Sequence, residues 1–230
     1  MISLSKVEAQ APGLVNLAKT AAVSLEKAGL AGQRAAVQLV LDHSGSMRGF
    51  YRDGSVQRLA EQTLGLSVNL DDDGSVPVSY FGASVDHTVD VRLDNYVGII
   101  DTTHTASAWG STNYVAAMQA AVEEHDINGF DFPGLVIFQT DGEPNDAEKT
   151  KRALRSISNR PLFFAFVGFG PERNMRFLQQ LDTLDGRQVD NASFFHAADP
   201  HTVTDEALYD GITGEFAGWL AAARAAGIVQ

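Results

Sequence analysis

Residues 39–49 read LVLDHSGSMRG and join a hydrophobic run to a cluster of oxygen-bearing side chains. The apolar run that ends at Leu41 is typical of a buried central strand. Asp42, Ser44 and Ser46 follow at alternate positions, before the chain turns on glycine. The packing of a strand does not require three polar side chains at its end. Their arrangement therefore points to a functional loop at this place.

Strand-like and helix-like segments alternate along the chain, which is the pattern of a parallel sheet flanked by helices. Apolar runs predict strands at residues 35–41, 76–81, 85–91, 135–139, 161–167 and 192–195. The second and third of these are expected to pair like a hairpin at a sheet edge. Apolar residues at helical spacing predict helices at residues 12–30, 56–70, 114–122, 177–184 and 208–223. A capping box of Asn145 and Glu148 predicts the start of one further helix.

Length and composition restrict the class of protein. The 230 residues suffice for one α/β domain, expected over residues 35–230, with residues 1–34 as a helical extension packed on it. The 17 basic and 29 acidic residues give a net charge of −12, which argues against nucleic acids and anionic membranes as partners. The absence of cysteine excludes disulfides and thiolate metal sites. Charged residues interrupt the N-terminal segment, so we expect a cytoplasmic protein without a membrane span.

Three loops carry most of the candidate oxygen ligands. The first contains Asp42, Ser44 and Ser46, the second contains Thr112 directly before a predicted helix, and the third contains Asp141 directly after a predicted strand. In open α/β sheets, ligands bind at the carboxyl ends of strands, where both aspartates fall. Hydroxyl and carboxylate oxygens are the ligands that hard divalent cations prefer. Because hydroxyls donate less charge than carboxylates, such a site would leave the cation ready to bind an external anion.

The pattern Asp42-x-Ser44-x-Ser46, followed later by Thr112 and Asp141, resembles the metal-ion-dependent adhesion site of von Willebrand factor type A domains. The resemblance covers the chain from about Ala35 onward. It implies a doubly wound, mainly parallel six-stranded sheet with one short antiparallel edge strand and helices on both faces. It also implies that the two serines and the threonine contact the cation, and that the aspartates often act through bound water. One coordination position would remain for a carboxylate of a partner protein.

Further segments resemble the bacterial tellurite-resistance and stress-response branch of these proteins. They are MISLSK, TAAVSLEKAGL, LDDDGSVPV, VIFQTDGEP, VDNASFFHA and WLAAARAAGIV. The resemblance to this branch implies a cytoplasmic protein that works in an assembly responding to chemical stress. It names neither the partner nor the oligomeric state.

Simpler interpretations exist for each candidate residue. The first loop resembles a turn or helix-cap cluster, Thr112 alone a helix cap, and Asp141 alone a turn. Glu143 is either a solvated acid or an outer partner of the site. His43 occupies the variable position of the motif and is expected to point away from the ligands. Nucleotide binding is not expected, because Arg173 stands where a dinucleotide fingerprint would need its third glycine.

These observations favour a binding module over an enzyme. The cation, with Mg²⁺ favoured and Mn²⁺ or Ca²⁺ as alternatives, would capture an acidic side chain of a partner protein. The first alternative is a metal-assisted hydrolase or phosphotransferase at the same loops, although the sequence offers neither a convincing general base nor a phosphate cradle. The second alternative is a structural scaffold that does not use the site.

Overall fold

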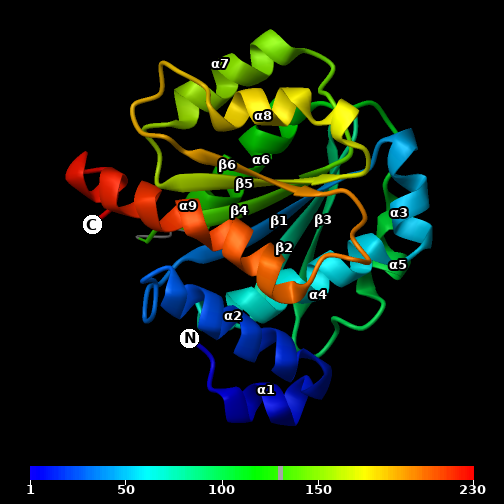
Figure 1. Cartoon of the computed structure of the whole chain (residues 1–230). Helices are drawn as coiled ribbons and strands as arrows, with labels where there is room; N and C mark the ends of the chain where they lie inside the picture. Colours follow the sequence, from blue (N-terminus) through cyan, green and yellow to red (C-terminus); the bar gives the residue numbers. More distant parts are fainter. Residues whose placement is uncertain (129–131) are drawn as a thin grey trace.

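A six-stranded sheet forms the centre of the computed structural model, which describes residues 1–128 and 132–230. The strands lie in the order β3-β2-β1-β4-β5-β6 (Figure 1). Their bounds are β1 (Ala36–Asp42), β2 (Ser75–Phe81), β3 (Val85–Arg92), β4 (Gly134–Thr140), β5 (Leu162–Phe169) and β6 (Ala192–Ala197). All neighbours pair in parallel except β2 and β3, which pair antiparallel at one edge. The predicted fold class and edge hairpin are therefore confirmed.

Helices cover both faces of the sheet. One face carries α1 (Leu4–Gln10), α2 (Val15–Lys27), α4 (Ser55–Ser67) and α9 (Asp205–Ala225). The other carries α6 (Tyr114–Ile127), α7 (Ala147–Ile157) and α8 (Arg176–Asp182). The short helices α3 (Arg48–Arg52) and α5 (Ile99–Thr103) lie beyond one end of the strands.

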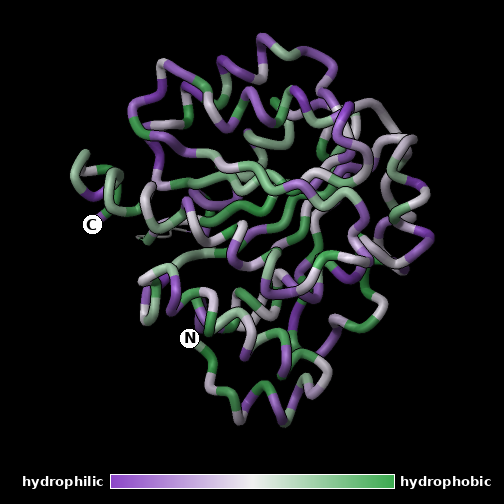
Figure 2. The backbone as a smooth tube through the Cα atoms, viewed as in Figure 1, coloured by the Kyte–Doolittle hydropathy of each residue, from purple (hydrophilic) through white to green (hydrophobic). Residues whose placement is uncertain are grey.

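The buried residues of β1 alternate between two hydrophobic cores, as the pleat of a strand requires. Leu39 and Leu41 belong to the core under α2, α4 and α9, whereas Val40 belongs to the core under α6, α7 and α8. Figure 2 shows hydrophobic residues concentrated along the central strands and hydrophilic residues on the outer turns. Among the described residues, no helix combines the length and the hydrophobicity that crossing a membrane requires.

Several boundaries differ from those that the sequence predicts. Helices α1, α3 and α5 were not expected, and α6 continues to Ile127 instead of ending near residue 122. The predicted capping box at the start of α7 is wrong. Asp146 is the N-cap, since its side chain accepts a hydrogen bond from the Lys149 N–H at 2.9 Å. Asn145 is instead bonded to the loop that carries Thr112, a tertiary contact that local sequence does not reveal.

The N-terminal helices pack into the same core as the sheet. Val7, Leu14 and Leu17 are each less than 3% exposed, although they precede the first strand. Helix α2 lies close to α4 at Gly65, where an added Cβ would lie 2.7 Å from Leu17 Cβ. The division of the chain at residue 35 into an extension and a domain stays a prediction.

The close approach of α2 and α4 predicts opposite effects for the same substitution at two helical glycines. Gly65→Ala should lower the free energy of unfolding by about 1–3 kcal/mol, because the new methyl group overpacks against Leu17. Gly214→Ala on α9, where a Cβ meets no atom within 4 Å, should raise it by about 0.5–1 kcal/mol. Urea denaturation measures both, and equal effects at the two sites would contradict this packing.

Candidate metal centre

The ends of β1 and β4 form the reversal point of the sheet. After β1 the chain continues to α3 and α4 on one face, and after β4 it continues to α7 on the other. Ligands of open α/β sheets bind at such a reversal. Asp42 is the last residue of β1 and Thr140 the last residue of β4, and the pairing of Leu41 with Gln139 brings the two ends level.

Asp42 is fully buried at this reversal point, and hydrogen bonds fix its carboxylate. The Ser44 N–H donates to Asp42 Oδ1 at 2.7 Å, and the Thr140 hydroxyl donates to Oδ2 at 2.7 Å. The hydroxyl of the buried Tyr114 lies 2.9 Å from Thr140 Oγ1, and the Tyr51 hydroxyl donates to the Asp42 carbonyl at 3.1 Å. Asp42 therefore fixes the conformation of the first loop from its buried side.

A row of oxygen atoms leads from the buried acid to the surface. Ser44 Oγ lies 3.1 Å from Ser46 Oγ, and the Ser46 hydroxyl donates to Asp141 Oδ1 at 3.0 Å. Ser46, Thr112 and Asp141 line a common hollow of about 240 Å³. Three of the five predicted site residues thus share one hollow, and hydrogen bonds connect Ser44 and Asp42 to it.

The second loop is held against the first by backbone contacts. The Gly110 N–H donates to the His43 carbonyl at 3.1 Å, and Ser44 and Gly110 form an isolated parallel bridge. An added Cβ at Gly110 would lie 2.9 Å from the backbone nitrogen of Ala83, which is closer than real Cβ atoms come. The close approach of the second loop to the turn between β2 and β3 therefore requires glycine at this position.

Thr112 is not a helix cap, contrary to the simpler interpretation of its sequence position. The N-cap of α6 is Asn113, whose side chain accepts a hydrogen bond from the Ala116 N–H at 3.2 Å. The backbone of Thr112 is bonded to Asn145 in both directions. Its N–H donates to Asn145 Oδ1 at 3.1 Å, and its carbonyl accepts from the Asn145 N–H at 2.9 Å. The second and third loops are thereby joined, and the Thr112 side chain lines the hollow.

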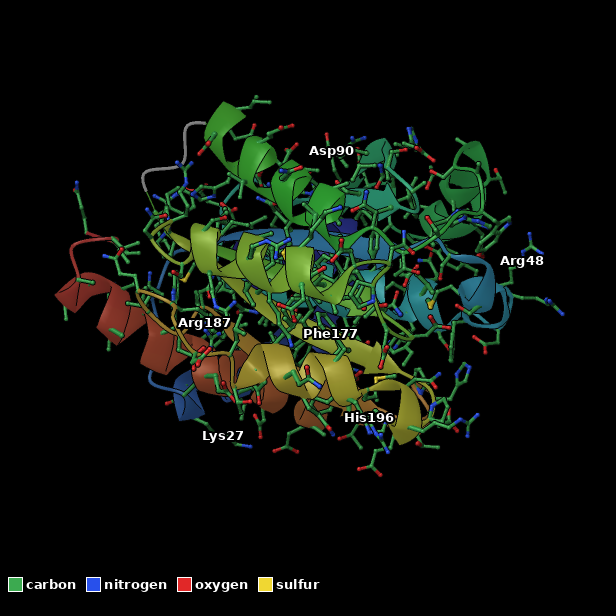
Figure 3. The ribbon with its side chains drawn as sticks, turned by 90° about the horizontal axis from the view of Figure 1, so that it is seen from above. Lys27, Arg48, Asp90, Phe177, Arg187 and His196 are labelled. Atoms are coloured by element: carbon green, nitrogen blue, oxygen red, sulfur yellow. The ribbon has the colours of Figure 1, made fainter. Side chains whose placement is uncertain are left out.

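His43 points away from the oxygen row, as expected, but it has a structural role that the sequence did not reveal. Its ring stacks on Trp109 with 3.8 Å between ring centres. Its Nδ1 lies 3.2 Å from the Ala108 carbonyl and its Nε2 lies 3.2 Å from His104 Nδ1. Arg48 lies over the same Trp109 ring, at the outer edge of the molecule (Figure 3). The first loop thus packs against the second through an aromatic cluster in which His43 is buried and Trp109 and His104 are partly exposed.

Arg173, Asn174 and Glu143 also line the hollow, and Arg173 was not a predicted site residue. It follows β5, the strand next to β4, so it reaches the same edge of the sheet as Asp141. Polar residues that follow parallel strands converge at one edge of the sheet. This rule identifies Asp42 and Asp141, and it would also have identified Arg173. The side chain of Asn174 donates a long hydrogen bond, 3.4 Å, to the Asp141 carbonyl.

Burial disfavours negative charge at both aspartates. Desolvation raises the pKa of Asp42 to about 6, although the hydrogen bonds from Thr140 and Ser44 oppose the shift. Burial also raises the pKa of Asp141, against the hydrogen bond from Ser46. Burial lowers the pKa of His43 and of His104, which favours neutral imidazoles in the aromatic cluster. A nearby cation would stabilise the ionised form of both acids.

The raised pKa of Asp42 predicts that the metal-free protein loses stability as the pH rises from 3.8 to about 6. In this window the carboxyl group is already ionised in the unfolded chain but still protonated in the fold. The unfolded state therefore binds fewer protons, and the free energy of unfolding falls by up to about 3 kcal/mol. Asp42→Asn should flatten this part of the pH profile, measured by urea denaturation. An identical slope in both proteins would contradict the assignment.

The stack of His43 on Trp109 predicts a loss of stability in His43→Ala. Removing the buried ring should lower the free energy of unfolding by about 2 to 5 kcal/mol, because a cavity remains beneath the second loop. Trp109 emission should shift to longer wavelength as water reaches the indole. His43→Phe, which keeps the ring, is the matched control and should show a smaller effect on both readouts. Equal effects in the two variants would show that stacking does not hold the loop.

Two sequence comparisons identify the family of this chain. The family model vWA-TerF-like, described as the vWA found in the TerF C terminus, matches residues 34–229. The protein YcbR of Bacillus subtilis (strain 168) is 31% identical over 217 residues, which cover 92% of this chain and 88% of YcbR.

Solved structures share the fold at low sequence identity. The manganese-loaded TRAP protein of Plasmodium vivax superposes with a TM-score of 0.51 and 17% identity, over 79% of this chain and 75% of that one. A von Willebrand factor type A protein from Catenulispora acidiphila gives 0.53 and 17%, over 81% of this chain and 43% of that one. The chain belongs to the vWA-TerF-like family, the von Willebrand factor type A domains found at the C terminus of TerF.

Proposed function

We propose that this chain is a divalent-cation-dependent protein-binding module and not an enzyme. The cation would be held by Asp42, Ser44, Ser46, Thr112 and Asp141. The observation that carries the proposal is the row of oxygens from Ser44 through Ser46 to Asp141, which ends in a hollow that Thr112 also lines. The bound cation would then take up a carboxylate of a partner protein.

The donor set fits a hard cation. Its side-chain donors are all oxygen atoms, which Mg²⁺, Mn²⁺ and Ca²⁺ prefer. Neighbouring ligands of octahedral Mg²⁺, each about 2.0–2.1 Å from the metal, lie about 3 Å apart. The separations of 3.1 Å and 3.0 Å between successive oxygens of the row agree with this spacing. We favour Mg²⁺, with Mn²⁺ and Ca²⁺ as alternatives, and the related TRAP structure is described as manganese-loaded.

The residues around the hollow suit the capture of a carboxylate. A bound cation would supply an electrophilic position for one carboxylate oxygen. Arg173 lines the same hollow and offers guanidinium donors to the other oxygen, and charge-assisted hydrogen bonds of this kind are short and strong. Arg173 would therefore bind the carboxylate of the partner, and the five oxygen-bearing residues would bind the cation.

The setting of this function is also proposed. The family description names TerF, so we propose a role in a tellurite-resistance or chemical-stress assembly in the cytoplasm. Residues 1–34 would be an extension of the binding domain that shares its core. The metal-assisted hydrolase remains the alternative, because Glu143 lines the hollow and could serve as a base. Metal-dependent hydrolysis of phosphate esters that Glu143→Gln abolishes would favour this alternative.

Asp141→Asn should weaken cation binding by about ten- to a hundredfold, because it removes one negative charge next to the cation. Isothermal titration calorimetry with Mg²⁺ and with Mn²⁺ measures the change. Asp90→Asn is the matched control, since it removes the same charge from an exposed position on β3 (Figure 3). The control should bind the cation as the parent chain does.

Two results would contradict the proposal. One is the absence of any heat of binding for Mg²⁺, Mn²⁺ and Ca²⁺ in the parent chain. The other is an equal loss of affinity in Asp141→Asn and Asp90→Asn, which would mean that net charge and not this site attracts the cation. Circular dichroism of both variants verifies that the fold is intact.

A further inference from the structure

The hollow at the candidate metal centre continues along the surface between α6 and α7. A second hollow of about 280 Å³ shares Thr112 with it. A third, of about 650 Å³, shares Val115 and Lys149 with the second. We call these three neighbouring hollows the trough. It starts at the oxygen row, passes the bonded pair Thr112 and Asn145, and follows α6 and α7.

The far part of the trough combines an apolar floor with a polar rim. Val115 and Val122 of α6 meet Ala153 and Ile157 of α7 along the seam. The three side chains other than Ile157 are partly exposed, so apolar surface stays open to solvent at this place. A bulky apolar side chain that covers this floor removes apolar surface from water, which favours binding.

The rim of the third hollow carries more basic than acidic side chains, although the chain as a whole is acidic. Lys149 and Arg152 of α7 line the third hollow against a single acid, Glu123 of α6. The chain as a whole carries a net charge of −12. Arg173 adds a further cation at the other end of the trough, where Asp141 and Glu143 also lie. In the second hollow, Asp146 pairs with Lys149 at 3.2 Å, which leaves Arg152 as the more available cation of α7. An acidic side chain would therefore be attracted to the third hollow through Arg152, and repelled by much of the remaining surface.

We propose that the trough between α6 and α7 binds an acidic protein segment whose first carboxylate reaches the metal centre. In the next part of the segment, an apolar side chain covers Val122 and Ala153, and a second acidic side chain pairs with Arg152. The inference rests on the proposed function, because the metal centre is one end of the trough. It adds the chemistry of the partner, which is an acidic segment with an apolar residue between its acids.

A displayed peptide library, selected on the Mg²⁺-loaded full chain, tests this proposal. The enriched sequences should hold two acidic residues separated by an apolar one. Fluorescence anisotropy of a labelled selected peptide should show about tenfold weaker binding to Arg152→Glu, because attraction becomes repulsion. Arg176→Glu is the matched control, since this exposed residue of α8 lies on the same side of the sheet and does not line the trough. Arg152→Lys should restore most of the affinity.

The outcomes separate this inference from the proposed function. Loss of binding both in Arg152→Glu and with a chelator supports the trough. Loss with a chelator and in Asp141→Asn, but not in Arg152→Glu, overturns the trough and leaves the metal centre standing. Binding that needs Arg152 but no metal would overturn the proposal that the segment spans the metal centre and the trough. A library without enriched acidic sequences would overturn it as well. A homodimer that Arg152→Glu dissociates would mean that a second copy fills the trough, and would also overturn the proposal.

Discussion

The burial of the Asp42 carboxyl group constrains the loops at the carboxyl ends of the parallel strands. A buried acid is tolerated only where hydrogen bonds satisfy it, and the Ser44 N–H and the Thr140 hydroxyl do so at 2.7 Å each. Because Thr140 ends β4, the acid ties the first loop to the neighbouring strand. The other loops are then arranged around this pair, through the His43 carbonyl on one side and Asp141 on the other.

The desolvation of Asp42 is not fully offset by these bonds, as its raised pKa indicates. The fold therefore holds an acid in an environment that disfavours its charge. Structures retain such unfavourable groups most often at functional sites, where a ligand relieves them. A cation beside the oxygen row would stabilise the ionised form of Asp42. This stabilisation is a thermodynamic argument for the proposed metal site. The same reasoning does not apply to Glu143, which is exposed.

Local sequence predicted the features that depend on local pattern. The apolar run before Asp42 predicted β1. The succession of strand-like and helix-like segments predicted the parallel sheet and its edge hairpin. The tertiary contacts were beyond such reasoning. Nothing near Asn145 shows that it bonds the Thr112 loop instead of starting α7, and nothing near His43 shows that Trp109 covers it. The five proposed ligands come from a motif, but the trough depends on how two distant helices pack side by side.

The separate origins of the oxygen row and the trough have a consequence for the effect of substitutions. The oxygens come from loops that the sheet and Asp42 hold fixed, so few substitutions there are compatible with the fold. The trough is made of partly exposed side chains on two helices, which tolerate exchange with little loss of stability. Substitutions on α6 and α7 would therefore change the binding preference of the proposed trough without disturbing the loops that would hold the cation.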